Sequence, residues 1–259
     1  MSWASGERYE PYVGRWSRLV ARGFLDWVRQ PAGGDWVDVG CGTGALTETI
    51  LASCGPRAVT GIDASPAYID FAKARVADGR VRFEIADAQT MPFDSASFDA
   101  AVSGLALNFV PDTRKATVEM RRVVRPTGIV ASYVWDYAGR MELMRYFWDA
   151  AVELNPQAAR FDEGKRFPIC KPDGLETLFR SAGLRAVETV TLDVPTVFHD
   201  FDDYWSPFLG GQGPAPAYNV SLSEPERAAL RELLQRRLPI RSDGSIHLVA
   251  RAWAVKGLV

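Results

Sequence analysis

Short apolar segments alternate with helical segments through the first half of the chain. The apolar segments have the length and residue types of buried strands, and they span residues 35–39, 58–63, 81–86, 98–103 and 129–135. Between them, helical spacing covers residues 45–53 and 113–124, and Ser65 followed by Pro66 is typical of a helix start. Five short strands separated by helices predict a mostly parallel sheet that is covered on both faces.

The second half of the chain has a different pattern. Helices are predicted over residues 141–154, 173–182 and 224–237, and alternating strands over residues 185–194 and 246–255. Two stretches rich in glycine, proline or aromatic residues, 137–172 and 200–223, are interpreted as insertions. We therefore expect one α/β domain with a sheet of about seven strands and two insertions.

Composition excludes several classes of protein. Hydrophobic residues make up 47% of the 259 positions and the net charge is only -2, which predicts a folded core rather than disorder. The 30 basic side chains do not exceed the 32 acidic ones, so the phosphate neutralisation that nucleic-acid binding requires is not expected. The longest weakly charged run, residues 100–111, is shorter than the roughly 20 apolar residues of a membrane span.

Cysteine and histidine usage predicts a cytoplasmic protein without a metal. Cys41, Cys54 and Cys170 are odd in number and form no C-x-x-C pair, which argues against a disulfide framework or a zinc site. The two histidines, His199 and His247, are far apart in the sequence, so a histidine-rich metal centre is excluded. The first eight residues carry charge and lack the apolar core of a secretory signal.

A glycine-rich loop follows the first strand and predicts a ligand site. Gly40, Gly42 and Gly44 lie where a buried strand turns into a helix, and a backbone without side chains there lets a ligand approach the helix N-terminus. The same string satisfies G-x-G-x-x-A through Ala45, and Asp63 lies roughly 20 residues further on, as in dinucleotide-binding folds. Taken alone, this loop fits a nicotinamide enzyme or a methyl-donor enzyme.

Further motifs accompany the loop in a fixed order between residues 35 and 136. They are Asp38 before the loop, Asp63 after the second strand, Asp87-Ala88 after the third, Met91-Pro92-Phe93, Ser97-Phe98-Asp99, and Arg122-Val123-Val124-Arg125-Pro126-Thr127-Gly128. This set resembles the class I S-adenosylmethionine-dependent methyltransferases, and within them the small-molecule branch that includes the ubiquinone and menaquinone biosynthesis enzymes. One departure is Thr127-Gly128, where the family usually has Gly-Gly.

The resemblance implies a fold and a division of the chain. It implies a Rossmann-like, doubly wound, seven-stranded sheet that is mostly parallel, with an antiparallel last strand. The chain would then be a single methyltransferase domain over residues 1–259. Within it, residues 1–34 would form an N-terminal helical lid, residues 35–136 the donor-binding half, and residues 137–172 and 200–223 the acceptor-side insertions.

The resemblance also assigns a donor site. Asp38 would position the loop and the donor's amino group, and Asp63 would accept hydrogen bonds from the two ribose hydroxyls, with a helix cap as its alternative role. Asp87 would bind the adenine amino group beside the backbone N–H of Ala88. The other donor contacts that the family implies are Gly40, Cys41, Gly42, Gly44, Ala64, Met91, Ser103, Gly104 and Leu105. From the N-terminal helix, Tyr12 and Trp16 would enclose the methionine end and Arg15 would pair with its carboxylate, ordinary helix packing being the alternative.

Acceptor recognition is expected over the carboxyl ends of the strands. Asn108 occupies a loop position that lies close to the methyl group in the family, and His199 is the candidate for a general base. Aromatic pocket candidates, for which core packing is the alternative, are Trp135, Tyr137, Trp205 and Phe208.

These features together predict a cytoplasmic methyltransferase that acts on a small, apolar or aromatic molecule. In-line displacement from S-adenosylmethionine yields S-adenosylhomocysteine and needs no metal, nucleophile or catalytic triad. We expect no nucleic-acid partner and no membrane span, and a monomer or homodimer. One alternative is a nicotinamide-dependent oxidoreductase, although no Tyr-x-x-x-Lys is present. The other is a donor-binding protein without turnover.

Overall fold

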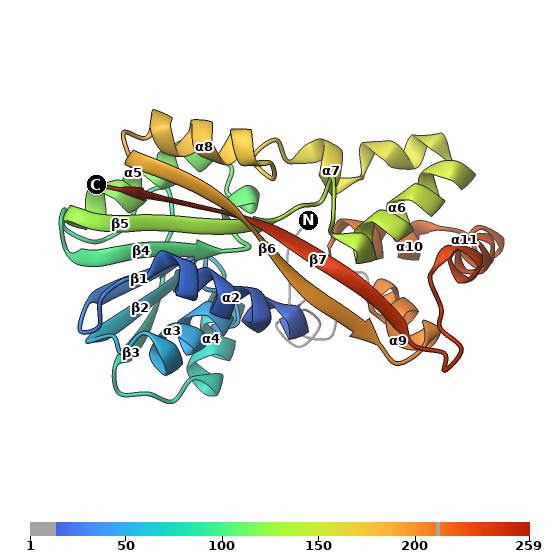
Figure 1. Cartoon of the computed structure of the whole chain (residues 1–259), viewed down its shortest axis with the longest axis horizontal. Coiled ribbons are helices and arrows are strands. Elements are labelled where there is room, and N and C mark those ends of the chain that lie inside the picture. The colour runs from blue at the N-terminus through green and yellow to red at the C-terminus, as the bar shows by residue number, and fades with distance from the viewer. Residues whose placement is uncertain (1–13, 211–212) are drawn as a thin grey trace.

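Seven strands form one twisted sheet in a computed structural model that describes residues 14–210 and 213–259 (Figure 1). Their order is β3-β2-β1-β4-β5-β7-β6. The bounds are Asp35–Val39 for β1, Ala58–Asp63 for β2, Val81–Ile85 for β3, Phe98–Gly104 for β4, Val124–Trp135 for β5, Arg185–Phe198 for β6 and Ile246–Leu258 for β7. The first five strands are parallel, and β7 runs antiparallel to both of its neighbours. The predicted fold class is thereby confirmed, including the antiparallel last strand.

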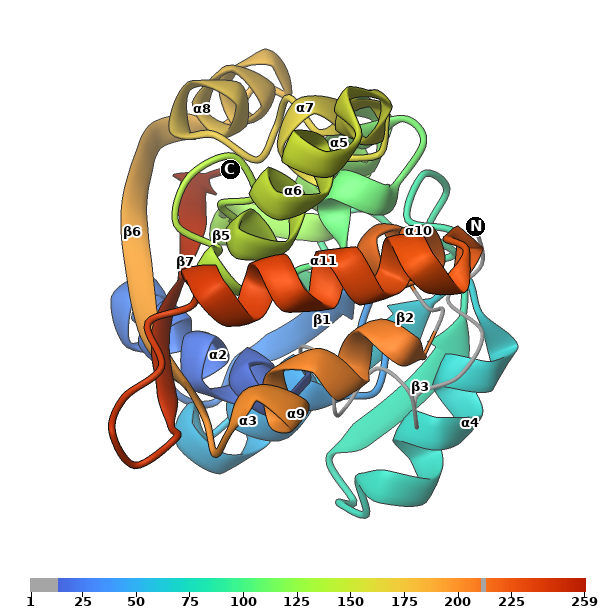
Figure 2. The same cartoon turned by 90° about the vertical axis from the view of Figure 1, so that its right-hand side faces the viewer.

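Helices cover both faces of this sheet, with α2, α3 and α4 on one face and α5 and α8 on the other (Figures 1 and 2). The α-helices are α2 Arg15–Val28, α3 Ala45–Ser53, α4 Pro66–Arg75, α5 Thr113–Val123, α6 Glu142–Leu154, α7 Glu163–Arg166, α8 Pro172–Ser181, α9 Phe201–Trp205, α10 Pro214–Ser221 and α11 Glu224–Arg237. Short 3-10 turns are η2 Leu107–Phe109, η3 Pro156–Arg160 and η4 Ser206–Leu209. Both faces of the central strands are therefore shielded from water, as parallel strands require.

One face of helix α2 is part of the hydrophobic core along the whole length of the helix. Trp16, Val20, Phe24 and Val28 recur every four residues, which places them on one stripe, and all four are buried. Phe24 packs on Tyr133 of β5 with ring centroids 4.7 Å apart. This segment of the predicted lid therefore packs against the sheet along its length.

Strand β5 begins earlier than predicted. Val124 pairs with Phe98 and the register then shifts, so that Ile129 pairs with Ala100 and the intervening residues form an irregularity within the strand. Thr127 has a φ of 70°, an uncommon conformation for a residue with a side chain. Its N–H donates to the carbonyl of Val259 at 3.2 Å, so the end of the chain holds this bulge in place.

Strands β6 and β7 extend past the end of β5. Trp135, the last residue of β5, pairs with Ala252, whereas β6 and β7 remain paired as far as Phe198 and Ile246. The paired ends form an arm that projects beyond the carboxyl ends of the parallel strands (Figure 1). Helices α9, α10 and α11 connect the two strands of the arm and lie near α6; we call these four helices the roof (Figure 2).

The roof has an aromatic core of its own. Phe208 stacks on Phe147 of α6 with centroids 4.5 Å apart and also contacts Tyr204 and Trp205. The hydroxyl of Tyr204 donates to the carbonyl of Leu143 at 3.0 Å, which ties α9 to α6. Two of the predicted acceptor residues, Trp205 and Phe208, therefore take the alternative role of core packing.

The described residues, 14–210 and 213–259, contain neither a membrane-spanning helix nor a group of metal ligands. Within these ranges, no helix is long and apolar enough to cross a membrane. In the same ranges, no three histidine, cysteine or acidic side chains come together as metal ligands. Cys41, Cys54 and Cys170 are all free thiols.

Candidate active site

A cavity of about 570 Å³ lies at the carboxyl ends of the parallel strands. It sits beside the junction of β1 and β4, where the strand order reverses, which is the usual ligand position in open α/β sheets. Its volume lies within the range of small-molecule pockets. Ten residues predicted for the donor site line it, namely Asp38, Gly40, Cys41, Gly42, Asp63, Ala64, Asp87, Ala88, Gly104 and Leu105.

The three glycines of the loop serve different purposes. All three have positive φ values, which favour glycine over any residue with a side chain. A Cβ on Gly40 would lie 2.5 Å from the Cβ of Ala106, and one on Gly44 would lie 3.1 Å from Val76, so these two glycines permit close packing. Gly42 has open space on its Cβ side and lines the cavity, whereas Gly44 lies outside it. Gly42 is thus the glycine that leaves room for a ligand.

Asp38 places a buried carboxyl group in the cavity wall. Its Oδ2 accepts a hydrogen bond from the Thr47 hydroxyl at 2.7 Å, but its Oδ1 has no partner in the described part of the chain. Burial raises the pKa of this carboxyl to about 7. An unpaired buried carboxylate oxygen is costly, so this position is suited to a ligand that brings a cationic or N–H donor.

Asp63 holds the glycine loop against the start of α4. Its Oδ2 accepts the N–H of Gly42 at 3.1 Å, and its Oδ1 accepts the N–H of Ser65 at 2.9 Å. Burial raises the pKa of this carboxyl, and the two backbone hydrogen bonds oppose the rise. The bond to Ser65 fixes the N-cap residue of α4, so Asp63 itself does not take the alternative role of a helix cap. Each oxygen retains a lone pair for a further donor.

Asp87 lies at the rim of the cavity, after β3. The backbone N–H of Gln89 donates to its Oδ1 at 2.8 Å, and this bond lowers the pKa of the carboxyl. Asp87 therefore stays ionised at neutral pH. Within the described residues, the neighbouring N–H of Ala88 makes no backbone hydrogen bond and is available to a ligand.

Several predicted donor residues lie outside the cavity. Nη1 of Arg15 is 3.0 Å from Oδ1 of Asp203, and its guanidinium stacks on the rings of Trp16 and Phe198. Arg15 therefore joins α2 to α9, and the lining of the cavity does not include it. Trp16 packs edge-on against Phe198 at 5.1 Å. Tyr12 lies outside the described residues.

Ser103 and Met91 are also buried away from the cavity lining. The carbonyl of Ser103 accepts a hydrogen bond from the Ser132 hydroxyl at 3.0 Å, which joins β4 to β5. Both residues thus contribute to the wall behind the cavity rather than to its surface.

The predicted acceptor residues are dispersed. Asn108 is buried in η2, and both polar atoms of its side chain lack a partner in the described part of the chain; its neighbours Ala106 and Phe109 line the cavity. Trp135 is buried at the end of β5. Tyr137 reaches the cavity only indirectly, because it packs on Phe167, which packs on Phe109.

His199 lies at the far end of the arm, exposed to solvent. Its backbone N–H donates to Asp203 at 3.0 Å. The cavity lining does not include it, so the structure gives the proposed base no access to a ligand there.

The sequence motifs missed several cavity residues. Among them are Ser17, Tyr68, Gln89 and Tyr133. A Cβ on Gly104 would lie 2.6 Å from the hydroxyl of Tyr133, so this phenol lies directly over the end of β4. The alternation of side chains along β5 could have predicted Tyr133, because it lies on the same face of the strand as Trp135, which is a predicted pocket residue.

Comparison with known proteins agrees with the geometry of this site. Residues 37–132 match the family model described as "Methyltransferase domain". The chain is 31% identical over 167 residues to the O-methyltransferase cnsE of Penicillium expansum, a match that covers 62% of this chain and 56% of that protein. Residues 37–132 are therefore similar to a methyltransferase domain, and the longer match to cnsE agrees with this.

Two further methyltransferases are similar to the chain. A 2-methyl-6-phytyl-1,4-hydroquinone methyltransferase of Synechocystis is 29% identical over 186 residues, which covers 71% of this chain and 57% of that one. A demethylmenaquinone methyltransferase of Staphylococcus aureus is 40% identical over 96 residues, 36% of this chain and 40% of that one. The chain spans about half the length of the curated relatives it matches.

Solved structures show the same fold at lower sequence identity. A putative methyltransferase from an antibiotic biosynthesis pathway of Anabaena variabilis superposes with a TM-score of 0.64 at 20% identity, covering 93% of this chain and 97% of that one. A phosphoethanolamine N-methyltransferase of Haemonchus contortus with bound S-adenosylhomocysteine has a TM-score of 0.59 at 16% identity, covering 97% and 56%.

Proposed function

We propose that this protein is a methyltransferase that binds S-adenosylmethionine in the cavity and transfers its methyl group to a small apolar or aromatic acceptor. The observation that carries the proposal is the convergence of Asp38, Asp63 and Asp87 on one cavity from the ends of three adjacent strands. Neighbouring strands lie about 4.8 Å apart, so the three carboxyl groups are spread in a row across roughly 10 Å. A long ligand with an amino acid at one end and a nucleoside at the other matches this row.

The residues present fit such a donor. The unpaired Oδ1 of Asp38 suits the donor's amino group, and Asp63 has lone pairs for the ribose hydroxyls. The free N–H of Ala88 beside Asp87 offers one donor and one acceptor to the edge of a purine. Gly42 leaves the space through which the chain of the ligand would pass.

Bound S-adenosylmethionine would supply a methyl group that its sulfonium already activates. The work of the protein is then to align the acceptor, to exclude water and to tolerate the loss of positive charge. Leu105, Phe109 and Val110 supply an apolar wall beside the end of β4 for this purpose. The names of the relatives, an O-methyltransferase and two enzymes of quinone type, support a small aromatic acceptor.

Calorimetry tests the donor. We expect S-adenosylmethionine and S-adenosylhomocysteine to bind and NAD not to bind. Tight binding of NAD alone would refute the methyltransferase proposal and favour the nicotinamide-dependent oxidoreductase. Asp63→Asn should weaken donor binding, whereas Asp70→Asn, on the exposed side of α4, serves as a matched control and should not.

Transfer of a radiolabelled methyl group to a panel of phenols, hydroquinones and aromatic amines tests turnover. Labelled product with at least one aromatic acceptor is expected. Donor binding without any transfer would favour the alternative of a binding protein.

A further inference from the structure

Trp135 has a buried indole N–H that lacks an acceptor. Only 2% of this residue is exposed, and within the described residues its Nε1 has no hydrogen-bond partner. The buried Trp148, by contrast, donates its indole N–H to the carboxylate of Glu163. Buried donors are rarely left without a partner, and Trp36 also lacks one, so it is the position of Trp135 beside the cavity that points to a ligand as its partner.

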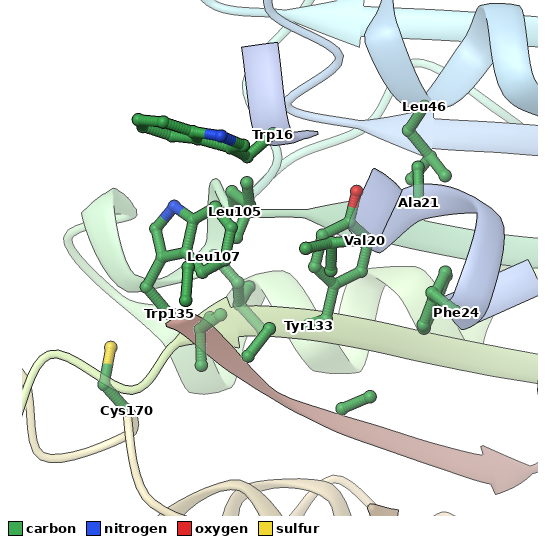
Figure 3. Packing of buried hydrophobic residues seen from close by; sticks show 14 of the residues in the cluster. Trp16, Val20, Ala21, Phe24, Leu46, Leu105, Leu107, Tyr133, Trp135 and Cys170 are labelled. Carbon is green, nitrogen blue, oxygen red and sulfur yellow. The ribbon is translucent and has the colours of Figure 1, made fainter. Parts of the chain in front are cut away.

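The position of Trp135 connects this donor to the cavity. Tyr133 precedes it by two residues on the same face of β5, and Tyr133 lines the cavity. Side chains two residues apart on a strand are about 7 Å apart, so Trp135 is the next side chain outward from the cavity wall. Figure 3 shows Trp135 close to Leu105, which also lines the cavity.

The nitrogen of Trp135 faces the ring of Trp16. In Figure 3 the indole of Trp16 lies across from the pyrrole edge of Trp135, which carries Nε1. Trp16 comes from the first turn of α2, and the next residue, Ser17, lines the cavity. The two indoles therefore flank a place that adjoins the cavity.

A second unpartnered group lies on the neighbouring element. Asn108 belongs to η2, which is in contact with β5, and 7% of the residue is exposed. Its side-chain carbonyl and amide both lack partners in the described ranges. Trp135 supplies a donor, and Asn108 can supply an acceptor. A hydroxyl group, which accepts one hydrogen bond and donates another, complements this pair.

We propose that Trp135 and Asn108 select a hydroxylated aromatic ring as the methyl acceptor, with the indole N–H of Trp135 bonded to an oxygen of that ring. This inference rests on the proposed function, because it places the acceptor next to a donor held in the cavity. An ammonium group has no lone pair for the N–H of Trp135, so a cationic amine is disfavoured.

Nuclear magnetic resonance of indole protons tests the contact directly. Protein labelled with [15N]tryptophan is titrated with 2-naphthol or with 2-methylnaphthalene, which has the same ring system but no hydroxyl, in the presence and absence of S-adenosylhomocysteine. The resonance assigned to Trp135 by its loss in Trp135→Phe should move downfield with 2-naphthol alone. If 2-naphthol fails to bind, or binds without this shift, the inference is wrong.

Matched variants separate the hydrogen bond from general packing. Trp135→Phe should weaken 2-naphthol binding about 3- to 10-fold, the range of one hydrogen bond, and leave 2-methylnaphthalene binding within about twofold. Trp36→Phe is the control, because Trp36 has the same unpartnered indole N–H but lies near the start of β1, away from the cavity. Equal effects of the two substitutions, or equal losses for both probes, overturn the inference.

The outcome is distinguishable from failure of the proposed function. If S-adenosylmethionine does not bind in calorimetry, the donor site is refuted, whether or not 2-naphthol shifts the Trp135 resonance. Normal donor binding together with a naphthol titration that leaves Trp135 unchanged refutes the acceptor contact alone.

Discussion

Replacing Asp38 by Asn should stabilise the ligand-free protein while it weakens donor binding. The Asp38 carboxyl is fully buried, and burial raises its pKa from an ordinary value of 3.8 to about 7. A difference of one in pKa between the folded and the unfolded state corresponds to about 1.4 kcal/mol. The ionised carboxyl therefore destabilises the folded state above pH 7 by roughly 4 kcal/mol. Loss of the charged hydrogen bond from Thr47 and burial of an amide offset part of this gain, so we expect a net gain of about 1–3 kcal/mol.

The pH dependence of stability follows from the same shift. Between pH 4 and pH 7 the folded protein binds more protons at Asp38 than the unfolded chain does, so the free energy of unfolding falls as the pH rises through this window. Glu163, which is buried outside the cavity, has its pKa raised to about 7 by burial and contributes in the same direction. Glu163→Gln is therefore a matched control for the loss of a buried acid.

Thermal unfolding from pH 4.5 to 8.5, with and without S-adenosylmethionine, measures both effects. For a chain of this size 1 kcal/mol corresponds to roughly 2 °C, so Asp38→Asn should melt about 2–6 °C higher at pH 8 without ligand. It should also lose most of the stabilisation by the ligand, whereas Glu163→Gln should keep it. A ligand-free Asp38→Asn protein that melts below the wild type at pH 8, or that responds fully to the donor, would refute this reasoning.

Three further outcomes are expected. Asp63→Ala should weaken donor binding by about 1.5–3 kcal/mol in calorimetry, the scale of hydrogen bonds to a charged group; unchanged affinity would leave Asp63 only its part in shaping the loop. Asp203→Asn breaks a half-exposed pair with Arg15 and should lower stability by no more than about 1 kcal/mol in low salt, with little effect on donor affinity. Gly40→Ala should destabilise the fold more than Gly42→Ala, because both residues have positive φ but only Gly40 also clashes with Ala106; Gly42→Ala should in addition weaken donor binding, and melting and calorimetry on both variants test this.

The strands and the donor loop could be predicted because their signals are local. An apolar run such as residues 58–63 and a glycine string that turns a strand into a helix need only a few neighbours to be recognised. The acidic residues at the strand ends then come together, because parallel strands bring their carboxyl ends to one edge.

The roof could not be predicted in this way. An aromatic residue such as Phe208 looks the same in sequence whether it faces a ligand or another helix, and here it stacks on Phe147, 61 residues earlier in the chain. Arg15 finds its partner Asp203 across 188 residues. Such pairings depend on how distant elements meet, and neither residue carries a local signal of its partner.

The arm has a consequence for how this protein can be altered. Phe198 and Ile246 face each other as the last pair of β6 and β7, so residues 199–245 leave and re-enter the domain at two points about 5 Å apart. A segment with adjoining ends can be exchanged for another of different length at little entropic cost. Helices α9, α10 and α11 are in this sense separable from the donor cavity, whereas α6 is not: another segment joined to the arm, or a tight turn in place of these three helices, would leave the glycine loop and its three carboxyl groups on unchanged strands.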